Sequence, residues 1–264
     1  MVPNHIVLQS RAMITVTGSD WRTFLQGLVT QDVETLQVGE LRFGGLLTPQ
    51  GRLLYDLFLV GTSDGCLLDV DAGHRPALIQ RLNMYRLRAK VVIEADDRPV
   101  SVGWNSPGPY VDPRLPTLGW RGYGMNDRPS GDERDYHRHC LALGVPSPTD
   151  WGSDKTYPIE ANFDLLGGID FQKGCFVGQE TASRMKRRGQ IKSRMLPIDL
   201  AGDLPEPGTE ILAGTLRAGS VLSGRDRRVM AILRLDRIEN QVLTVNGQSA
   251  TVEWPTWMPR APAA

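Results

Sequence analysis

The chain has 264 residues, which is long for a single hydrophobic core, so two or three compact modules are expected. Its 30 lysines and arginines balance 30 aspartates and glutamates, which excludes the overall field of a dedicated nucleic-acid or membrane-surface protein. Cys66, Cys140 and Cys175 show no Cys-x-x-Cys spacing, which argues for a reducing compartment and against a structural zinc site. Residues 1–10 lack a signal-peptide pattern, and no apolar run reaches the length of a membrane span. These features predict a cytoplasmic protein without a membrane partner.

The first half of the chain is predicted to mix strands and helices. Apolar, branched segments predict strands at 5–17, 41–47, 53–60, 66–70 and 89–95. Helical spacing predicts helices from Trp21 and at 74–88. Thr48-Pro49-Gln50-Gly51 has the composition of a tight turn and joins two of the strands as a hairpin. The glycine-, proline- and aromatic-rich segment 103–132 is left without regular structure.

The second half changes character near residue 195. Before it, helices are predicted at 135–143 and from about Gly178. After it, short strands separated by turns are predicted at 195–200, 209–213, 216–222, 228–235, 242–245 and 248–253. Regular short strands of this kind indicate a small barrel. The fold class is therefore α+β, with an α+β region of two interleaved subdomains at 1–192 and a β-barrel domain at 193–264.

The octapeptide Lys173-Gly174-Cys175-Phe176-Val177-Gly178-Gln179-Glu180 carries the main chemical signal. Its glycines permit unusual backbone angles and close approach to the main chain. Lys173, the basic run that follows, and a helix N-terminus near Gly178 would stabilise a thiolate at Cys175, which is the reactive form of cysteine. The alternative is that Cys175 is an inert residue of the core, where cysteine is often found.

Two further features have both a functional and a structural interpretation. Asp56 lies in an apolar strand, where a carboxylate needs a partner, so it is a candidate for ligand recognition or for an ion pair with Arg88. Asp69 and Asp71 are predicted to lie in a solvated turn. Six basic residues between Arg184 and Arg194 could hold a polyanion such as a polyglutamate tail, or form a solvated helix face. No aromatic residue is interleaved with them, so direct nucleic-acid binding is not expected.

Four blocks of the sequence resemble the YgfZ-like folate-binding proteins, relatives of the glycine-cleavage T-protein (aminomethyltransferase) that include mitochondrial iron–sulfur cluster factors. The octapeptide matches the family signature. The other blocks are Phe24-Leu25-Gln26-Gly27-Leu28-Val29-Thr30-Gln31-Asp32, Leu47-Thr48-Pro49-Gln50-Gly51-Arg52, and Tyr85-Arg86-Leu87-Arg88-Ala89-Lys90-Val91. Pro158, Glu160 and Asn162 occupy the usual approach to the cysteine.

This resemblance implies a T-protein-like arrangement of three subdomains around a central channel that accepts tetrahydrofolate or a one-carbon derivative. In T-proteins an aspartate on the strand after the hairpin lies beside the reactive folate nitrogen, and Asp56 occupies the corresponding position. Catalytic roles are expected for Cys175 and Asp56. Cofactor contacts are expected from Asp56, Arg88, Lys173, Gln179 and Glu180. The glutamate that grips the pterin ring in T-proteins has no counterpart here.

The leading hypothesis is a tetrahydrofolate-binding accessory protein for iron–sulfur cluster assembly or repair, with Cys175 as the key thiol and with iron–sulfur client or assembly proteins as partners. One alternative is a folate-dependent aminomethyltransferase. The presence of the cysteine motif and the missing pterin glutamate favour the accessory role. A second alternative is a tRNA-modification factor that uses residues 184–194, which would show tight, salt-dependent tRNA binding.

Overall fold

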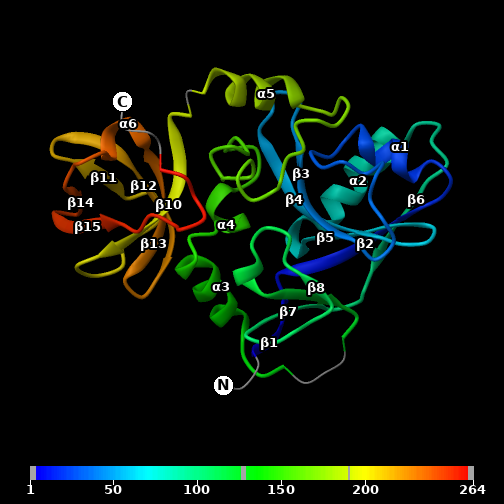
Figure 1. Cartoon of the computed structure of the whole chain (residues 1–264), viewed down its shortest axis with the longest axis horizontal. Helices are drawn as coiled ribbons and strands as arrows, with labels where there is room; N and C mark the ends of the chain where they lie inside the picture. Colours follow the sequence, from blue (N-terminus) through cyan, green and yellow to red (C-terminus); the bar gives the residue numbers. More distant parts are fainter. Residues whose placement is uncertain (1–3, 126–128, 190, 261–264) are drawn as a thin grey trace.

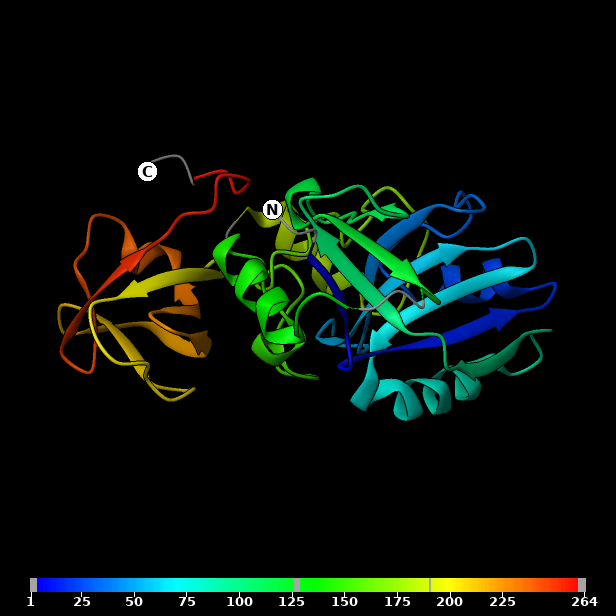
Figure 2. The ribbon, with the colours of Figure 1, turned by 90° about the horizontal axis from the view of Figure 1, so that it is seen from below.

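The computed structural model describes residues 4–125, 129–189 and 191–260. A closed β-barrel lies at one end of an elongated molecule, and two open sheets with their helices form the other part (Figures 1 and 2). The predicted α+β fold class with a C-terminal barrel is confirmed. The predicted division between residues 192 and 193 falls at the start of the first barrel strand and stays a prediction.

The larger open sheet has five antiparallel strands. In spatial order they are β3 (Leu41–Leu47), β4 (Leu53–Gly61), β5 (Gly65–Asp71), β2 (Arg11–Thr17) and β6 (Val92–Asp96). The predicted hairpin is present, and Gly51 at its turn has φ +83°, a backbone angle that glycine adopts without strain. The short helix α1 (Trp21–Gln26), the 3-10 turn η1 (Ala72–His74) and the helix α2 (Arg75–Arg86) complete this part. Leu25 and Leu78 bury their side chains against one face of the sheet.

A second, four-stranded sheet crosses the other face of this region. Its spatial order is β1 (Asn4–Val7), β7 (Val100–Trp104), β9 (Trp120–Tyr123) and β8 (Tyr110–Val111), with the 3-10 turn η2 (Pro116–Leu118) before β9. The sequence predicts no regular structure for segment 103–132, and within the described residues its regular structure is confined to this sheet and turn. Residues 126–128 of that segment lie outside the described residues.

The barrel contains all six predicted strands in a closed order. They are β10 (Ser193–Leu200), β13 (Arg228–Arg234), β12 (Leu216–Arg225), β11 (Glu210–Ala213), β14 (Leu243–Val245) and β15 (Gln248–Val252). A one-turn helix, α6 (Leu235–Ile238), follows β13. Alternate residues of β10, such as Leu196 and Ile198, face a separate barrel core, as strand geometry requires.

Three helices lie between the barrel and the sheets (Figure 1). They are α3 (Glu133–Ala142), α4 (Pro148–Trp151) and α5 (Gln179–Arg188). Asp132 caps α3 by accepting a hydrogen bond from the Arg134 amide, and Asp135 completes a capping box. The helix α3 packs its Tyr136 and Cys140 into a core shared by both open sheets, α4 and the segment before α5. Within the described part of the chain, no helix is long and apolar enough to cross a membrane.

Candidate functional site

A buried cluster of charged side chains joins the two open sheets. Asp69 on β5 is fully buried, and its carboxylate accepts hydrogen bonds from Arg11 Nε at 2.6 Å and Arg121 Nη2 at 2.6 Å. Burial alone raises the pKa of the Asp69 carboxyl, but the two guanidinium groups outweigh burial and hold that pKa below its usual value. The prediction that Asp69 lies in a solvated turn is therefore wrong, because two arginines from other strands compensate its charge.

Asp56 on β4 belongs to the same cluster. Its Oδ2 accepts a hydrogen bond from Arg11 Nη1 at 2.7 Å, and the Asp56 residue is only 3% exposed. The ion pair with Arg88 predicted from sequence is wrong, because Arg88 is an exposed residue just beyond the end of α2. Arg88 also does not line the cavity beside Asp56, so the structure does not bring it to this candidate site.

Arginine side chains also stack on one aromatic ring of the cluster. The guanidinium carbons of Arg121, Arg114 and Arg11 lie 3.8, 4.9 and 5.5 Å from the centre of the Phe58 ring. Arg114 forms a bidentate pair with Asp112, with Nη2 to Oδ2 at 2.7 Å, and donates to the Tyr136 hydroxyl at 2.8 Å. The planar guanidinium suits both contacts at once. These bonds fix the directions of the three arginines.

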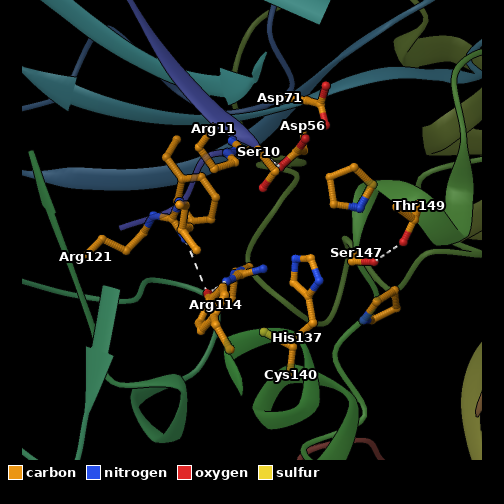
Figure 3. A pocket seen from close by; sticks show the side chains of 15 residues that line it. Ser10, Arg11, Asp56, Asp71, Arg114, Arg121, His137, Cys140, Ser147 and Thr149 are labelled. Carbon is orange, nitrogen blue, oxygen red and sulfur yellow. Dashed lines mark hydrogen bonds and ion pairs between the residues drawn. The ribbon is translucent and has the colours of Figure 1, made fainter. Parts of the chain in front are cut away.

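A cavity of about 80 Å³ opens beside this cluster, between the five-stranded sheet and the helices α3 and α4 (Figure 3). Asp56 and Arg114 both lie on its wall. Asp56 Oδ1 and Arg114 Nη1 make no hydrogen bond with any described residue, although the other polar atoms of both side chains are paired. These two side chains therefore offer one free hydrogen-bond acceptor and one free donor to a bound molecule.

A second cavity of about 240 Å³ adjoins the first and reaches the barrel. The two cavities share His137, Cys140, Ser147 and Thr149 as lining residues. On the far side the second cavity is lined by Ser223, Gly224 and Arg225 of the barrel strand β12. Because they share these residues, the two cavities lie side by side between the sheet and the barrel.

Most members of this cluster were not identified from the sequence. Asp56 was a candidate, but Arg11, Arg114, Arg121 and Tyr136 were not. Arg121 gave the clearest signal, because it lies between Trp120 and Gly122 in a short segment rich in aromatic residues. An arginine in such a segment needs a carboxylate partner once it is buried. The sequence does not show which carboxylate that is.

The thiol of Cys175 lies in a different place, on an exposed loop just before α5. Phe176, its neighbour, takes the buried position in the core. The alternative that Cys175 is packed in the core is therefore wrong. Cys66 and Cys140, in contrast, are buried, and burial raises the pKa of the Cys140 thiol to about 11.

Lys173 anchors the cysteine loop to the segment after α1. Its Nζ donates hydrogen bonds to the carbonyl oxygens of Gln26, Val29 and Gln31 at 2.7–2.8 Å. Burial lowers the pKa of the Lys173 ammonium to about 8, although nearby carboxylates oppose this shift. No hydrogen bond joins Lys173 to Cys175 in the described chain, so the ammonium serves mainly to hold the loop backbone.

The β3–β4 turn supports the same loop from another side. Gly178 has φ +82°, and a Cβ placed there would lie 2.6 Å from the carbonyl oxygen of Thr48. A Cβ on Gly51 would lie 2.7 Å from the Cβ of Thr181 in α5. Three of the four sequence blocks that suggested the family therefore meet around the loop: 24–32, 47–52 and 173–180.

Gln179 and Glu180 begin α5 and face a surface hollow rather than the cavity beside Asp56. The hollow, of about 580 Å³, is lined by Phe171, Gln179, Glu180, Ser183, Lys186 and Arg187. Neither this hollow nor the two inner cavities includes both Cys175 and Asp56. The structure thus separates the predicted site residues into a thiol loop and an inner cavity. Among the described residues, no three His, Cys, Asp or Glu side chains are grouped to hold a metal ion.

The fold defines the class of protein. Over 98% of its length the chain superimposes on 87% of the glycine cleavage system aminomethyltransferase T from Bartonella henselae, with a TM-score of 0.72 and 15% sequence identity. At this identity the likeness establishes a T-protein-like fold. Residues 192–260 match the family of the CAF17 C-terminal beta-barrel domain.

The chain is also similar in sequence to a group of iron–sulfur cluster assembly factors. The chain is 28% identical to the mitochondrial iron–sulfur cluster assembly factor IBA57 of Mus musculus, over 96% of this chain and 85% of that protein. It is 31% identical to the IBA57 homologue of Neurospora crassa, over 75% and 54%, and 33% identical to that of Mycosarcoma maydis, over 74% and 57%. These similarities agree with the resemblance to T-protein-like iron–sulfur cluster assembly factors that the four sequence blocks predicted.

The names of these relatives correct one prediction. All three are mitochondrial proteins, which contradicts the prediction of a cytoplasmic location. The features behind that prediction were a neutral charge, unpaired cysteines and the lack of a signal-peptide pattern. These features do not distinguish the cytoplasm from the interior of a mitochondrion.

Proposed function

We propose that the protein is a tetrahydrofolate-binding accessory factor for iron–sulfur cluster assembly or repair, with Cys175 as its key thiol. The observation that carries this proposal is the exposed Cys175 on a loop held by Lys173, Gly178 and the β3–β4 turn. A held, accessible thiol suits transient bonding to a cluster or exchange with a client thiol. The names of the IBA57 relatives support the iron–sulfur role.

The inner cavity is the proposed site for folate. A pterin edge presents N–H donors and a carbonyl acceptor, and these match the free Asp56 Oδ1 and Arg114 Nη1 on the cavity wall. Pockets for ligands of this size usually measure about 300–1,000 Å³. Neither inner cavity reaches that size alone, so folate would extend from the first cavity into the second, past His137 and Ser147.

Aminomethyl transfer is the second candidate function, and the T-protein fold together with the position of Asp56 on the cavity wall favours it. Bound folate would supply the nitrogen that accepts a one-carbon unit. In that case Asp56 would orient the ligand, while Cys175, which does not line the cavity, would have no role. An assay of aminomethyl transfer with a purified lipoyl carrier protein separates the two functions.

Two variants test the two parts of the leading proposal independently. We expect Asp56→Asn to weaken tetrahydrofolate binding about 10- to 100-fold in a calorimetric titration, because a charged acceptor of the ligand is lost. We expect Cys175→Ser to keep normal folate affinity but to abolish cluster-enzyme activity in a strain that depends on this protein. Since Cys175 lies outside the cavity, folate should leave its alkylation rate unchanged.

Asp97→Asn is the matched control, because Asp97 is an exposed carboxylate that lines neither inner cavity nor the hollow beside α5. Equal folate affinity in wild type and Asp56→Asn would contradict the proposal that folate binds in the inner cavity. Full cluster-enzyme activity with Cys175→Ser would contradict the proposed role of the Cys175 thiol.

A further inference from the structure

The exposed face of α5 carries cations that no carboxylate neutralises. Arg184, Lys186 and Arg187 are exposed and form no ion pair with any described residue. Some arginines elsewhere in the chain, such as Arg98 and Arg134, have carboxylate partners within 2.6 Å. A local excess of positive charge therefore remains on α5 although the net charge of the chain is zero.

One cation of this face is held in place, and a hollow lies beside it. The Lys186 Nζ sits 3.9 Å from the centre of the Phe171 ring, so the ammonium is positioned rather than freely extended. Glu180 and Ser183 line the same hollow of about 580 Å³, which is large enough to receive several side chains of a partner. Glu180 adds one negative charge that would fix the orientation of what binds there.

The thiol loop leads directly into this face. Cys175 precedes the first residue of α5 by four positions, and α5 lies along an outer edge of the molecule, between the barrel and the five-stranded sheet (Figure 1). At a rise of about 1.5 Å per residue, Arg184 is about 8 Å along the axis from the start of the helix. That is within the Debye length of about 10 Å at 0.1 M salt, so the charge of Arg184 contributes to the potential at the end of α5 where the thiol loop joins it.

We propose that α5 is a docking face for an acidic protein surface, and that it delivers that partner to Cys175. This inference rests on the proposed role of Cys175 and adds the kind of partner. A nucleic acid suits the face less well, because its one aromatic ring, Phe171, is covered by Lys186 and the neutral chain lacks a long-range positive field. The mixed charges and the hollow fit a folded acidic surface better than a phosphate backbone.

Thiol exchange with charged peptides tests this proposal. Matched peptides rich in aspartate, serine or lysine each carry one cysteine activated as a 2-pyridyl disulfide. The Cys175 thiolate attacks the peptide sulfur, a new disulfide forms, and 2-thiopyridone leaves and is measured by its absorbance, so no oxidant is needed. Cys175→Ser supplies the blank, since the other two cysteines are buried.

We expect the acidic peptide to react about tenfold faster than the serine peptide at low salt, and about twofold faster at 0.5 M salt. The double variant Arg184→Glu/Arg187→Glu should remove this preference. The double variant Arg86→Glu/Lys90→Glu, which makes the same charge change at the exposed end of α2, should keep it.

Equal rates for the three peptides, or the same loss in both double variants, would overturn the proposal. So would stronger protection of Cys175 by bulk tRNA than by an unactivated acidic peptide at equal charge concentration, because the face would then bind nucleic acid. If Arg184→Glu/Arg187→Glu removes the peptide preference but Cys175→Ser retains cluster-enzyme activity, the docking face is supported and the proposed function is wrong.

Discussion

The Asp69 carboxylate shows how a single buried charge organises the inner cavity. It binds Arg11 and Arg121, and Arg11 in turn holds Asp56 at the cavity wall. Burying one ion costs several kcal/mol unless its partners are well placed. Here both guanidiniums also lie over the Phe58 ring, so the position of Asp56 depends on the charge of Asp69, which does not line the cavity.

We predict that Asp69→Asn destabilises the protein by about 3–5 kcal/mol at pH 7, because it leaves two buried guanidiniums without a full counter-charge. The folded pKa of Asp69 lies below its unfolded value of about 3.9, so its contribution is complete above pH 4 and is lost as the pH falls through the folded pKa. Urea denaturation should show that the difference in free energy of unfolding between Asp69→Asn and wild type becomes smaller as the pH falls from 7 to 3.

Asp97→Asn provides the control for that series, since its side chain is 95% exposed and should change stability by less than about 0.5 kcal/mol. A gap of the same size at every pH would mean that Asp69 acts through packing rather than through its charge.

For Asp56 and Cys175, only some of the observed properties were predictable from the sequence. The apolar strand 53–60 predicted that Asp56 needs a partner, and this was right. The partner is Arg11, 45 positions away, and it was missed because nothing local to either residue records the pairing of β2 with β5. Cys175 was found from its motif, but whether it was packed or exposed required the structure.

At the level of elements, the turn of β3 and β4 and the start of α5 form one interlocked unit. Gly51 and Gly178 both have positive φ, and each leaves no room for a side chain next to the other segment. Gly174, in the same motif, has no atom within 4 Å of the position its Cβ would take. The two glycines of the cysteine motif therefore have different physical roles.

We predict that Gly178→Ala destabilises the protein by about 1–3 kcal/mol, because it combines an unfavourable φ with a contact at 2.6 Å to the Thr48 carbonyl oxygen. Gly174→Ala should stay within about 0.5 kcal/mol of wild type in the same urea denaturation. If Gly174→Ala nevertheless lowers cluster-enzyme activity, the open space above Gly174 serves a partner. Equal stability of the two variants would contradict the steric argument.

The elements were predictable where the pattern was strong and local. The six barrel strands, the hairpin, and the helices α2 and α3 follow from periodicity and turn residues. The strand β7 was missed, because its pairing with β1 joins segments nearly 100 residues apart. The helix α1 ends at Gln26, earlier than its apolar spacing suggested, and the carbonyl oxygens of Gln26 and Val29 accept hydrogen bonds from Lys173.

In the whole molecule, buried polar contacts join the barrel to the sheets. Arg194 at the start of the barrel pairs with Asp164 at 2.8 Å and donates to the Ile159 carbonyl oxygen at 2.9 Å. Across the second cavity, Ser223 of β12 donates a hydrogen bond to Asp150 of α4 at 2.5 Å. Ser223 reaches α4 at a register shift in β12, where an irregularity redirects the strand. The proposed folate space thus depends on how these two parts are held together.

Asp150 gives a pH test of that junction. Burial raises the pKa of its carboxyl, although Ser223 and Ser147 donate to it and oppose the shift. As the pH rises from about 4, the folded protein keeps the Asp150 proton longer than the unfolded chain does, so this group lowers stability until the folded pKa is passed. At pH 7 the ionised, buried carboxylate of Asp150 therefore lowers the free energy of unfolding.

We predict that Asp150→Asn is more stable than wild type at pH 7, with a gain on the order of 1 kcal/mol that disappears towards pH 4. The amide oxygen can still accept from the Ser147 amide, and the amide nitrogen can donate to the Ser223 oxygen, which then acts as acceptor in place of donor. Ser223→Ala, which removes the barrel's donor, should instead lower stability by about 1 kcal/mol at pH 7. Thermal unfolding of the three proteins at both pH values checks this, and a destabilised Asp150→Asn protein at pH 7 would show that the junction needs the ionised carboxylate.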